Sequence, residues 1–213
     1  MPLPASRSRF GPPGIDVWIF ASGVVLLVVT VVLSRALATE MGEMLTRNTV
    51  RLSLSWYALT LCVMMRLAAC DWDASTPAGR AARDCWTLAL LCFLVHLSMA
   101  FHYYHYWSHA HAFERTREIG GVGEGIYVSY LFTVVWALDV SYWWLRPTSY
   151  ATRSAWLGIA LHGFMLFIVF NSTVIYETGP IRWAGILLFG GLAAVWLATR
   201  RRRRSQLAGM API

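Results

Sequence analysis

Six long runs of apolar residues, separated by short polar segments, dominate this 213-residue sequence and leave few ways for it to fold. A hydrocarbon core of about 30 Å needs roughly 20 apolar residues in a helix to cross it. The runs are continuous and do not alternate between apolar and polar residues, so helices are favoured over the strands of a barrel. The predicted spans are 17–38, 51–70, 85–107, 125–146, 154–175 and 181–199.

The composition agrees with insertion into a membrane. Charged residues make up 14% of the chain and hydrophobic residues 57%, whereas average soluble domains carry about 25% charged residues. A soluble domain with so little charge would expose large apolar patches. We therefore predict an all-α integral membrane protein: a six-transmembrane-helix bundle with short loops over residues 17–199, an N-terminal tail of residues 1–16 and a basic C-terminal tail of residues 200–213.

The basic residues indicate how the chain is oriented. All 18 are arginines, and five of them, Arg200 to Arg204, directly follow the last span, where contact with anionic lipid is expected. With both termini inside, 12 arginines lie on the inner side and 6 on the outer side, which uses all 18. The positive-inside rule then predicts a multi-pass protein of the inner (plasma) membrane with cytoplasmic termini.

The same residues bear on partners and chemistry. Without lysine, a Schiff-base mechanism is excluded. No basic face with interleaved aromatic residues lies outside the spans, so nucleic acid is not an expected partner. The bilayer itself is the expected surrounding, and the bundle is compatible with a homo-oligomer or a larger membrane complex.

Histidines are concentrated in one segment, since residues 96–118 hold five of the six. If the third helix continues past the membrane edge, three of them share one stripe at helical spacing. Imidazoles spaced by four residues can reach one Zn, Fe or Cu ion. The predicted metal ligands near the outer face are His102, His105, His109 and His111, with Glu114 and Glu118 as candidate general bases.

An alternative interpretation needs no metal. Tyr, Trp and His side chains gather where membrane helices meet the headgroups, so the histidines and their aromatic neighbours would form an interfacial belt. The aromatic residues at predicted span ends are Tyr103, Tyr104, Tyr106, Trp107, Tyr142, Trp143 and Trp144.

Three ionisable residues lie inside predicted spans: His96, Asp139 and His162. Such groups are costly in hydrocarbon unless paired, which makes them candidates for cofactor binding. Asp139 and His162 stand on spans joined by a short loop, so a hydrogen bond between them is expected. His96 and His162 have similar predicted depths, and the alternatives are axial ligation of a b-type haem, a proton relay or part of a metal site.

The favoured function is a redox or hydrolytic membrane enzyme that acts on a lipid-soluble substrate through this His-rich metal- or haem-associated site. The alternative is a non-catalytic membrane protein, either a small proton-coupled transporter or an accessory subunit of a membrane complex. In that case the histidines serve only as an interfacial belt.

Overall fold

A computed structural model describes residues 14–37 and 40–209 of the chain. These residues form helices and connecting turns, with no strand among them, which confirms the all-helical prediction. Each predicted span corresponds to one long helix: α1 (Ile15–Leu37), α2 (Met41–Met64), α3 (Pro77–Tyr103), α5 (Gly125–Leu145), α7 (Ala155–Phe170) and α8 (Gly179–Gly209). The shorter elements are η1 (Ala69–Asp71), α4 (His109–Gly120), α6 (Pro147–Ala151) and the π-helical η2 (Asn171–Ile175).

Five helical segments in the described part of the chain are long and apolar enough to cross a membrane: α1, α3, α5, α7 with η2, and α8. Helix α2 falls short because its first half carries Glu43, Arg47 and Arg51. The helical structure is therefore compatible with a multi-pass membrane protein, while membrane insertion and the count of six spans stay predictions.

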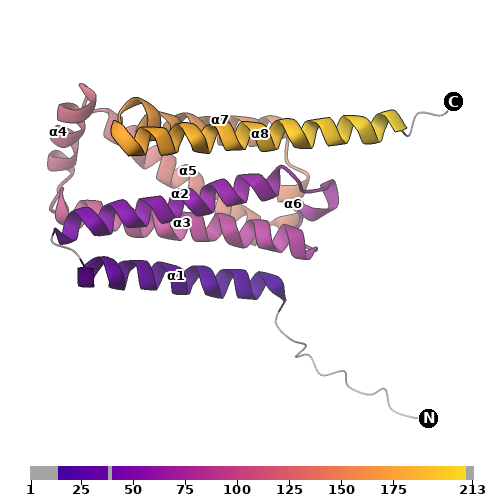
Figure 1. The fold of residues 1–213 in the computed structure, drawn as a ribbon, viewed down its shortest axis with the longest axis horizontal. Helices are drawn as coiled ribbons and strands as arrows, with labels where there is room; N and C mark the ends of the chain where they lie inside the picture. The colour runs from indigo at the N-terminus through magenta and orange to yellow at the C-terminus, as the bar shows by residue number, and fades with distance from the viewer. Residues whose placement is uncertain (1–13, 38–39, 210–213) are drawn as a thin grey trace, which may run out of the picture.

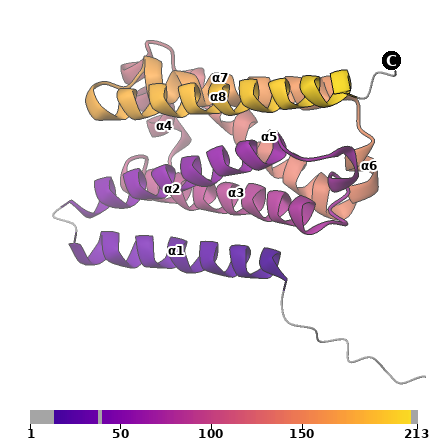
Figure 2. The same ribbon diagram turned by 45° about the vertical axis from the view of Figure 1, so that its right-hand side comes forward.

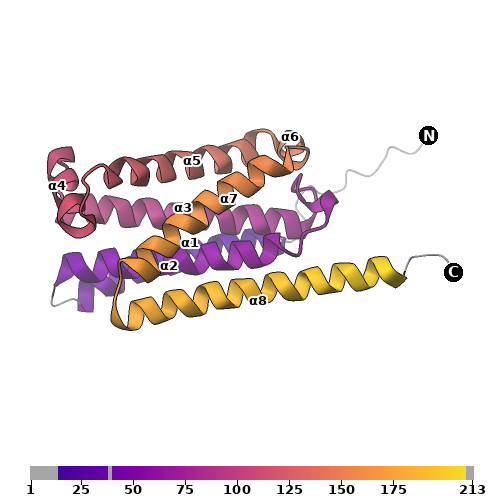
Figure 3. The same cartoon turned by 90° about the horizontal axis from the view of Figure 1, so that it is seen from above.

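The helices lie roughly side by side along one axis. Helices α1, α2 and α3 are neighbours, and α4 lies across one end of the bundle (Figure 1). Figure 2 shows α1 as the outermost helix on one side, with α7 and α8 on the other. Helix α7 starts beside α6, crosses obliquely and leads through η2 into α8, which lies along α2 (Figure 3).

Two of the long helices begin earlier than predicted. Helix α3 starts at Pro77, eight residues before the predicted 85, because the Thr76 hydroxyl accepts a hydrogen bond from the Gly79 backbone N–H and proline suits the first helical position. Helix α2 starts at Met41, ten residues before the predicted 51. In both cases the first turns are polar, so they lie outside the apolar run.

The predicted tails are described only in part. Most of the predicted tail of residues 1–16 lies outside the described residues. At the other end, α8 continues as one helix through Arg200–Arg204 to Gly209, and residues 210–213 lie outside the described part.

An aromatic core joins α2, α3 and α5. Trp86 is fully buried, and its ring centroid lies 4.9 Å from that of Trp136 and 5.6 Å from that of Tyr57. Trp143, expected in an interfacial belt, is also fully buried. That expectation was wrong for Trp143 because its ring stacks on Tyr150 of α6, which folds back under the end of α5.

Candidate functional site

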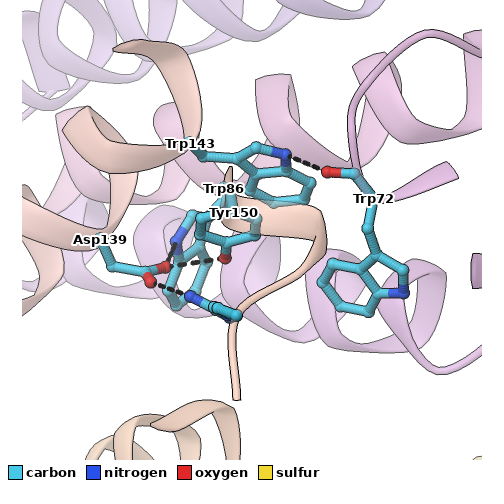
Figure 4. A network of polar contacts seen from close by, with 6 residues as sticks. Trp72, Trp86, Asp139, Trp143 and Tyr150 are labelled. Atoms are coloured by element: carbon cyan, nitrogen blue, oxygen red, sulfur yellow. Dashed lines mark hydrogen bonds and ion pairs between the residues drawn. The ribbon is translucent and has the colours of Figure 1, made fainter. Parts of the chain in front are cut away.

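Asp139 is a buried acid on α5, with 5% of its surface exposed. Its Oδ2 accepts hydrogen bonds from Trp86 Nε1 at 2.9 Å and from the Tyr150 hydroxyl at 3.1 Å. Its Oδ1 accepts from Arg153 at 2.5 Å in an ion pair whose arginine side chain is 10% exposed (Figure 4). Three donors from α3, α6 and the turn after α6 therefore satisfy the carboxylate, and its charge is compensated.

Stacked rings extend this network. The Arg153 guanidinium lies 3.7 Å from the centroid of the Tyr150 ring, a cation–π contact. The Tyr150 and Trp143 rings are stacked with centroids 4.5 Å apart. Trp143 Nε1 donates to the backbone oxygen of Trp72 at 2.9 Å (Figure 4). The network thus ties α5 to α3, to α6, to the segment between α2 and α3 and to the turn that precedes α7.

The expected hydrogen bond between Asp139 and His162 is absent. Both carboxylate oxygens of Asp139 are occupied by other donors, and neither ring nitrogen of His162 has a hydrogen-bond partner within the described residues. The prediction was wrong because Arg153 and Tyr150, which the sequence placed only in a loop, fold back onto Asp139.

His162 lies instead against Trp86, with ring centroids 5.6 Å apart, and lines a cavity between α2, α7 and α8. The cavity has a volume of about 550 Å³. Apart from His162, its lining is apolar or aromatic: Leu61, Met64, Met65, Trp72, Leu166, Phe189, Leu192, Ala193 and Trp196. A neutral imidazole always carries one N–H, so burying both nitrogens without a partner costs about 1–3 kcal/mol.

His96 is placed differently from the prediction. Because α3 begins at Pro77, His96 lies near the far end of the helix, and its Nδ1 is 2.9 Å from the backbone oxygen of Thr46 on α2. His162 contacts Trp86, which is ten residues or about 15 Å earlier along α3. The two imidazoles are thus at different levels, and the structure does not support a haem held between them.

The predicted stripe of three histidines on one helix was wrong. Helix α3 ends at Tyr103, and α4 starts at His109 after a turn in which Tyr106 and Trp107 have positive φ values of 49° and 58°. The Ser108 hydroxyl caps α4 by accepting from the His111 backbone N–H. Serine at the start of a helix was the sequence signal for this break.

The histidines of this segment consequently have separate neighbours. His102 packs edge-on to Tyr103, His111 contacts Tyr106, and His109 lies between Tyr127 and Tyr130 of α5. The closest polar contact is 3.0 Å, between His109 Nδ1 and the Tyr130 hydroxyl.

His105 is half-buried and packs edge-on against Phe101. Burial lowers the pKa of the His105 imidazole, and the charges of His111 and Arg115 lower it further.

The predicted metal site gains no support from this arrangement. Among residues 14–37 and 40–209, no three His, Cys, Asp or Glu side chains come together as a metal ion would require. The two candidate bases, Glu114 and Glu118, are exposed and form ion pairs with Arg117 and Arg115 on their own helix.

Sequence reasoning missed Arg153, Tyr150 and Trp86 as partners of Asp139. Arg153 had been counted only as a loop arginine. The available signal was its distance of 14 residues from an acid in the preceding span, across a turn containing Pro147. An acid inside a membrane span is expected to pair with a basic residue. Arg153 was the nearest arginine after Asp139 in the sequence apart from Arg146.

Comparison with known protein families, characterised proteins and solved structures finds no match to this chain.

Proposed function

We propose that this multi-pass membrane protein binds a lipid-soluble molecule in the cavity between α2, α7 and α8, with His162 as the polar group that meets it. The observation that supports this proposal is the cavity itself. Its volume is about 550 Å³, its lining is apolar or aromatic apart from His162, and the two buried ring nitrogens of His162 lack a partner within the described residues. Ligand pockets commonly measure about 300–1,000 Å³ and combine an apolar wall with few polar groups.

The chemistry of His162 supports this choice. Both ring nitrogens are covered by protein atoms in this structure. A polar atom of a bound molecule would therefore pair with one of them, and so favour the bound state, once the His162 side chain turns toward the cavity. If the protein is the redox or hydrolytic enzyme that the sequence suggested, His162 is the titratable group in the cavity wall that would exchange a proton with the substrate. The proposal leaves out the histidines of residues 102–111, because they belong to two helices and a turn.

A cavity-filling variant with an adjacent control tests the proposal. Ala193 and its neighbour Ala194 are both exposed, but only Ala193 lines the cavity. Native mass spectrometry and solvent extraction of the gently solubilised protein should find a retained lipid-soluble molecule in the wild type and in Ala194→Trp. Ala193→Trp should lose it. Equal retention in Ala193→Trp would overturn the proposal.

A second variant separates His162 from the cavity shape. His162→Leu keeps an apolar side chain of similar reach but removes both nitrogens. We expect weaker retention of the molecule together with unchanged or higher thermal stability of the ligand-free protein, since an unpaired buried N–H has been removed. Undiminished retention would show that His162 does not contact the molecule.

From the arginine distribution we further propose that both termini face the cytoplasm of a plasma-type membrane. Cysteine-labelling of positions at either end of the bundle in intact cells would test this orientation.

A further inference from the structure

A second, larger cavity opens beside the one at His162. Its volume is about 770 Å³, and the two cavities share four lining residues: Met64, Met65, Trp72 and Trp196. The two cavities therefore adjoin one another between α2, α7 and α8, and we call the pair the α7–α8 groove. It runs from an apolar end near Phe189 to a polar end at Arg200 and Arg203.

The polar end of the α7–α8 groove is positively charged. Arg200 and Arg203 line it, and no carboxylate does. Neither arginine forms an ion pair within the described part of the chain. The groove therefore presents two guanidinium groups that no carboxylate in its wall neutralises.

Both guanidinium groups are held in place by neighbours. Arg203 NH2 donates to the backbone oxygens of Met65 at 3.3 Å and Leu67 at 3.1 Å, which anchors α8 to the end of α2. Arg200 lies over the ring of Trp196, 5.0 Å from its centroid. A planar guanidinium that is already oriented loses less entropy when it binds a phosphate than a free side chain does.

The length of the groove matches a lipid chain. Eleven residues of helix separate Phe189 from Arg200, since 200 − 189 = 11, which is about 16 Å. This is about half of the ~30 Å hydrocarbon core, the depth of one leaflet. An amphipathic molecule with its headgroup at Arg200 would therefore extend its chain as far as the apolar end of the groove.

We propose that the α7–α8 groove is a binding site for one anionic membrane lipid, with its phosphate at Arg200 and Arg203 and an acyl chain in the cavity beside His162. This inference rests on the proposed function and specifies the class of ligand. It also separates these two arginines from the rest of the basic segment. All five arginines are exposed, but Arg201, Arg202 and Arg204 do not line the groove.

The position of the arginines provides a test with matched charge. The double variants Arg200→Gln/Arg203→Gln and Arg201→Gln/Arg202→Gln lose the same charge, but only the first pair lines the groove. Binding of dioleoylphosphatidylglycerol and dioleoylphosphatidylcholine to the detergent-solubilised full chain would be measured by native mass spectrometry. Arg203→Lys keeps the positive charge but removes the guanidinium that joins α8 to the end of α2. It therefore shows whether a loss of binding comes from the charge or from that contact.

The wild type and Arg201→Gln/Arg202→Gln should bind phosphatidylglycerol about tenfold more tightly than phosphatidylcholine. Arg200→Gln/Arg203→Gln should lose this preference, and Arg203→Lys should keep most of it. Equal affinity of the wild type for both lipids, or equal loss in both double variants, would overturn the inference.

The same measurement distinguishes failure of the inference from failure of the proposed function. Suppose that Ala193→Trp weakens the binding of both lipids and that the wild type prefers neither. The cavity beside His162 then still binds an acyl chain, but the headgroup site at the arginines is refuted. If Ala193→Trp changes the binding of neither lipid, the cavity proposal fails, and the lipid site inferred from it fails as well.

Discussion

Replacing Asp139 by Asn should destabilise the fold more than any other change of a single charge in the described helices. Asp139 is 5% exposed and the Arg153 side chain 10%. Removing one partner of a buried ion pair costs about 3–5 kcal/mol, because the other charge is left uncompensated. For a chain of this size, each kcal/mol corresponds to about 2–4 °C, so the melting temperature should fall by about 6–20 °C.

Asparagine cannot reproduce the hydrogen bonds of the carboxylate. Donors approach both Asp139 oxygens: Arg153 approaches one, while Trp86 and Tyr150 approach the other. An amide has one oxygen, so its NH₂ group must face a donor on one side. The loss of charge and the loss of an acceptor therefore act in the same direction.

Thermal unfolding in detergent, followed by tryptophan fluorescence and circular dichroism, measures this effect. Glu114→Gln is the control, because the pair of Glu114 with Arg117 is exposed and should contribute less than about 1 kcal/mol. The double variant Asp139→Asn/Arg153→Met should be more stable than Asp139→Asn alone, since no unpaired guanidinium remains. A melting temperature for Asp139→Asn within about 2 °C of the wild type would refute the reasoning.

Three further predictions concern two helical glycines and the protonation of His105. Gly79→Ala should lower stability by about 1–3 kcal/mol in thermal unfolding, because the added Cβ would lie 1.9 Å from the Asp71 backbone oxygen. Gly163→Ala should instead raise it by about 0.5–1 kcal/mol, since nothing lies within 4 Å of its added Cβ; a decrease would contradict this. The lowered pKa of His105 means that the native state resists protonation of this imidazole, so stability is retained above about pH 6.5 and falls as pH decreases through the lowered pKa. The drop in melting temperature from pH 7.5 to 5.5 should therefore be smaller in His105→Gln, and an equal drop would count against the assignment.

The sequence predicted the helical segments well and their ends less well. The apolar runs coincide with α1, α5, α7 and α8 to within a few residues, apart from the extension of α8 through its arginines. Helices α2 and α3 begin earlier than the runs because a helix can start with polar turns. For α3, the start at Thr76–Pro77 was readable from its capping residues.

The candidate site could be predicted only in part. Asp139 and His162 were correctly singled out as ionisable residues inside apolar helices. Their expected pairing was wrong, because depth along two helices does not specify how each helix is rotated. The histidine stripe failed for a local reason, the turn at residues 104–108, which helical periodicity alone does not reveal.

The sequence by itself determined that this chain forms long apolar helices, because in hydrocarbon each backbone N–H and C=O must be satisfied within its own segment. The tertiary structure alone decided that Arg153 and Tyr150 reach Asp139 and that His162 faces a cavity. These contacts depend on helix rotation and on the oblique crossing of α7. Side-chain packing sets both, and the hydropathy of the sequence does not predict that packing.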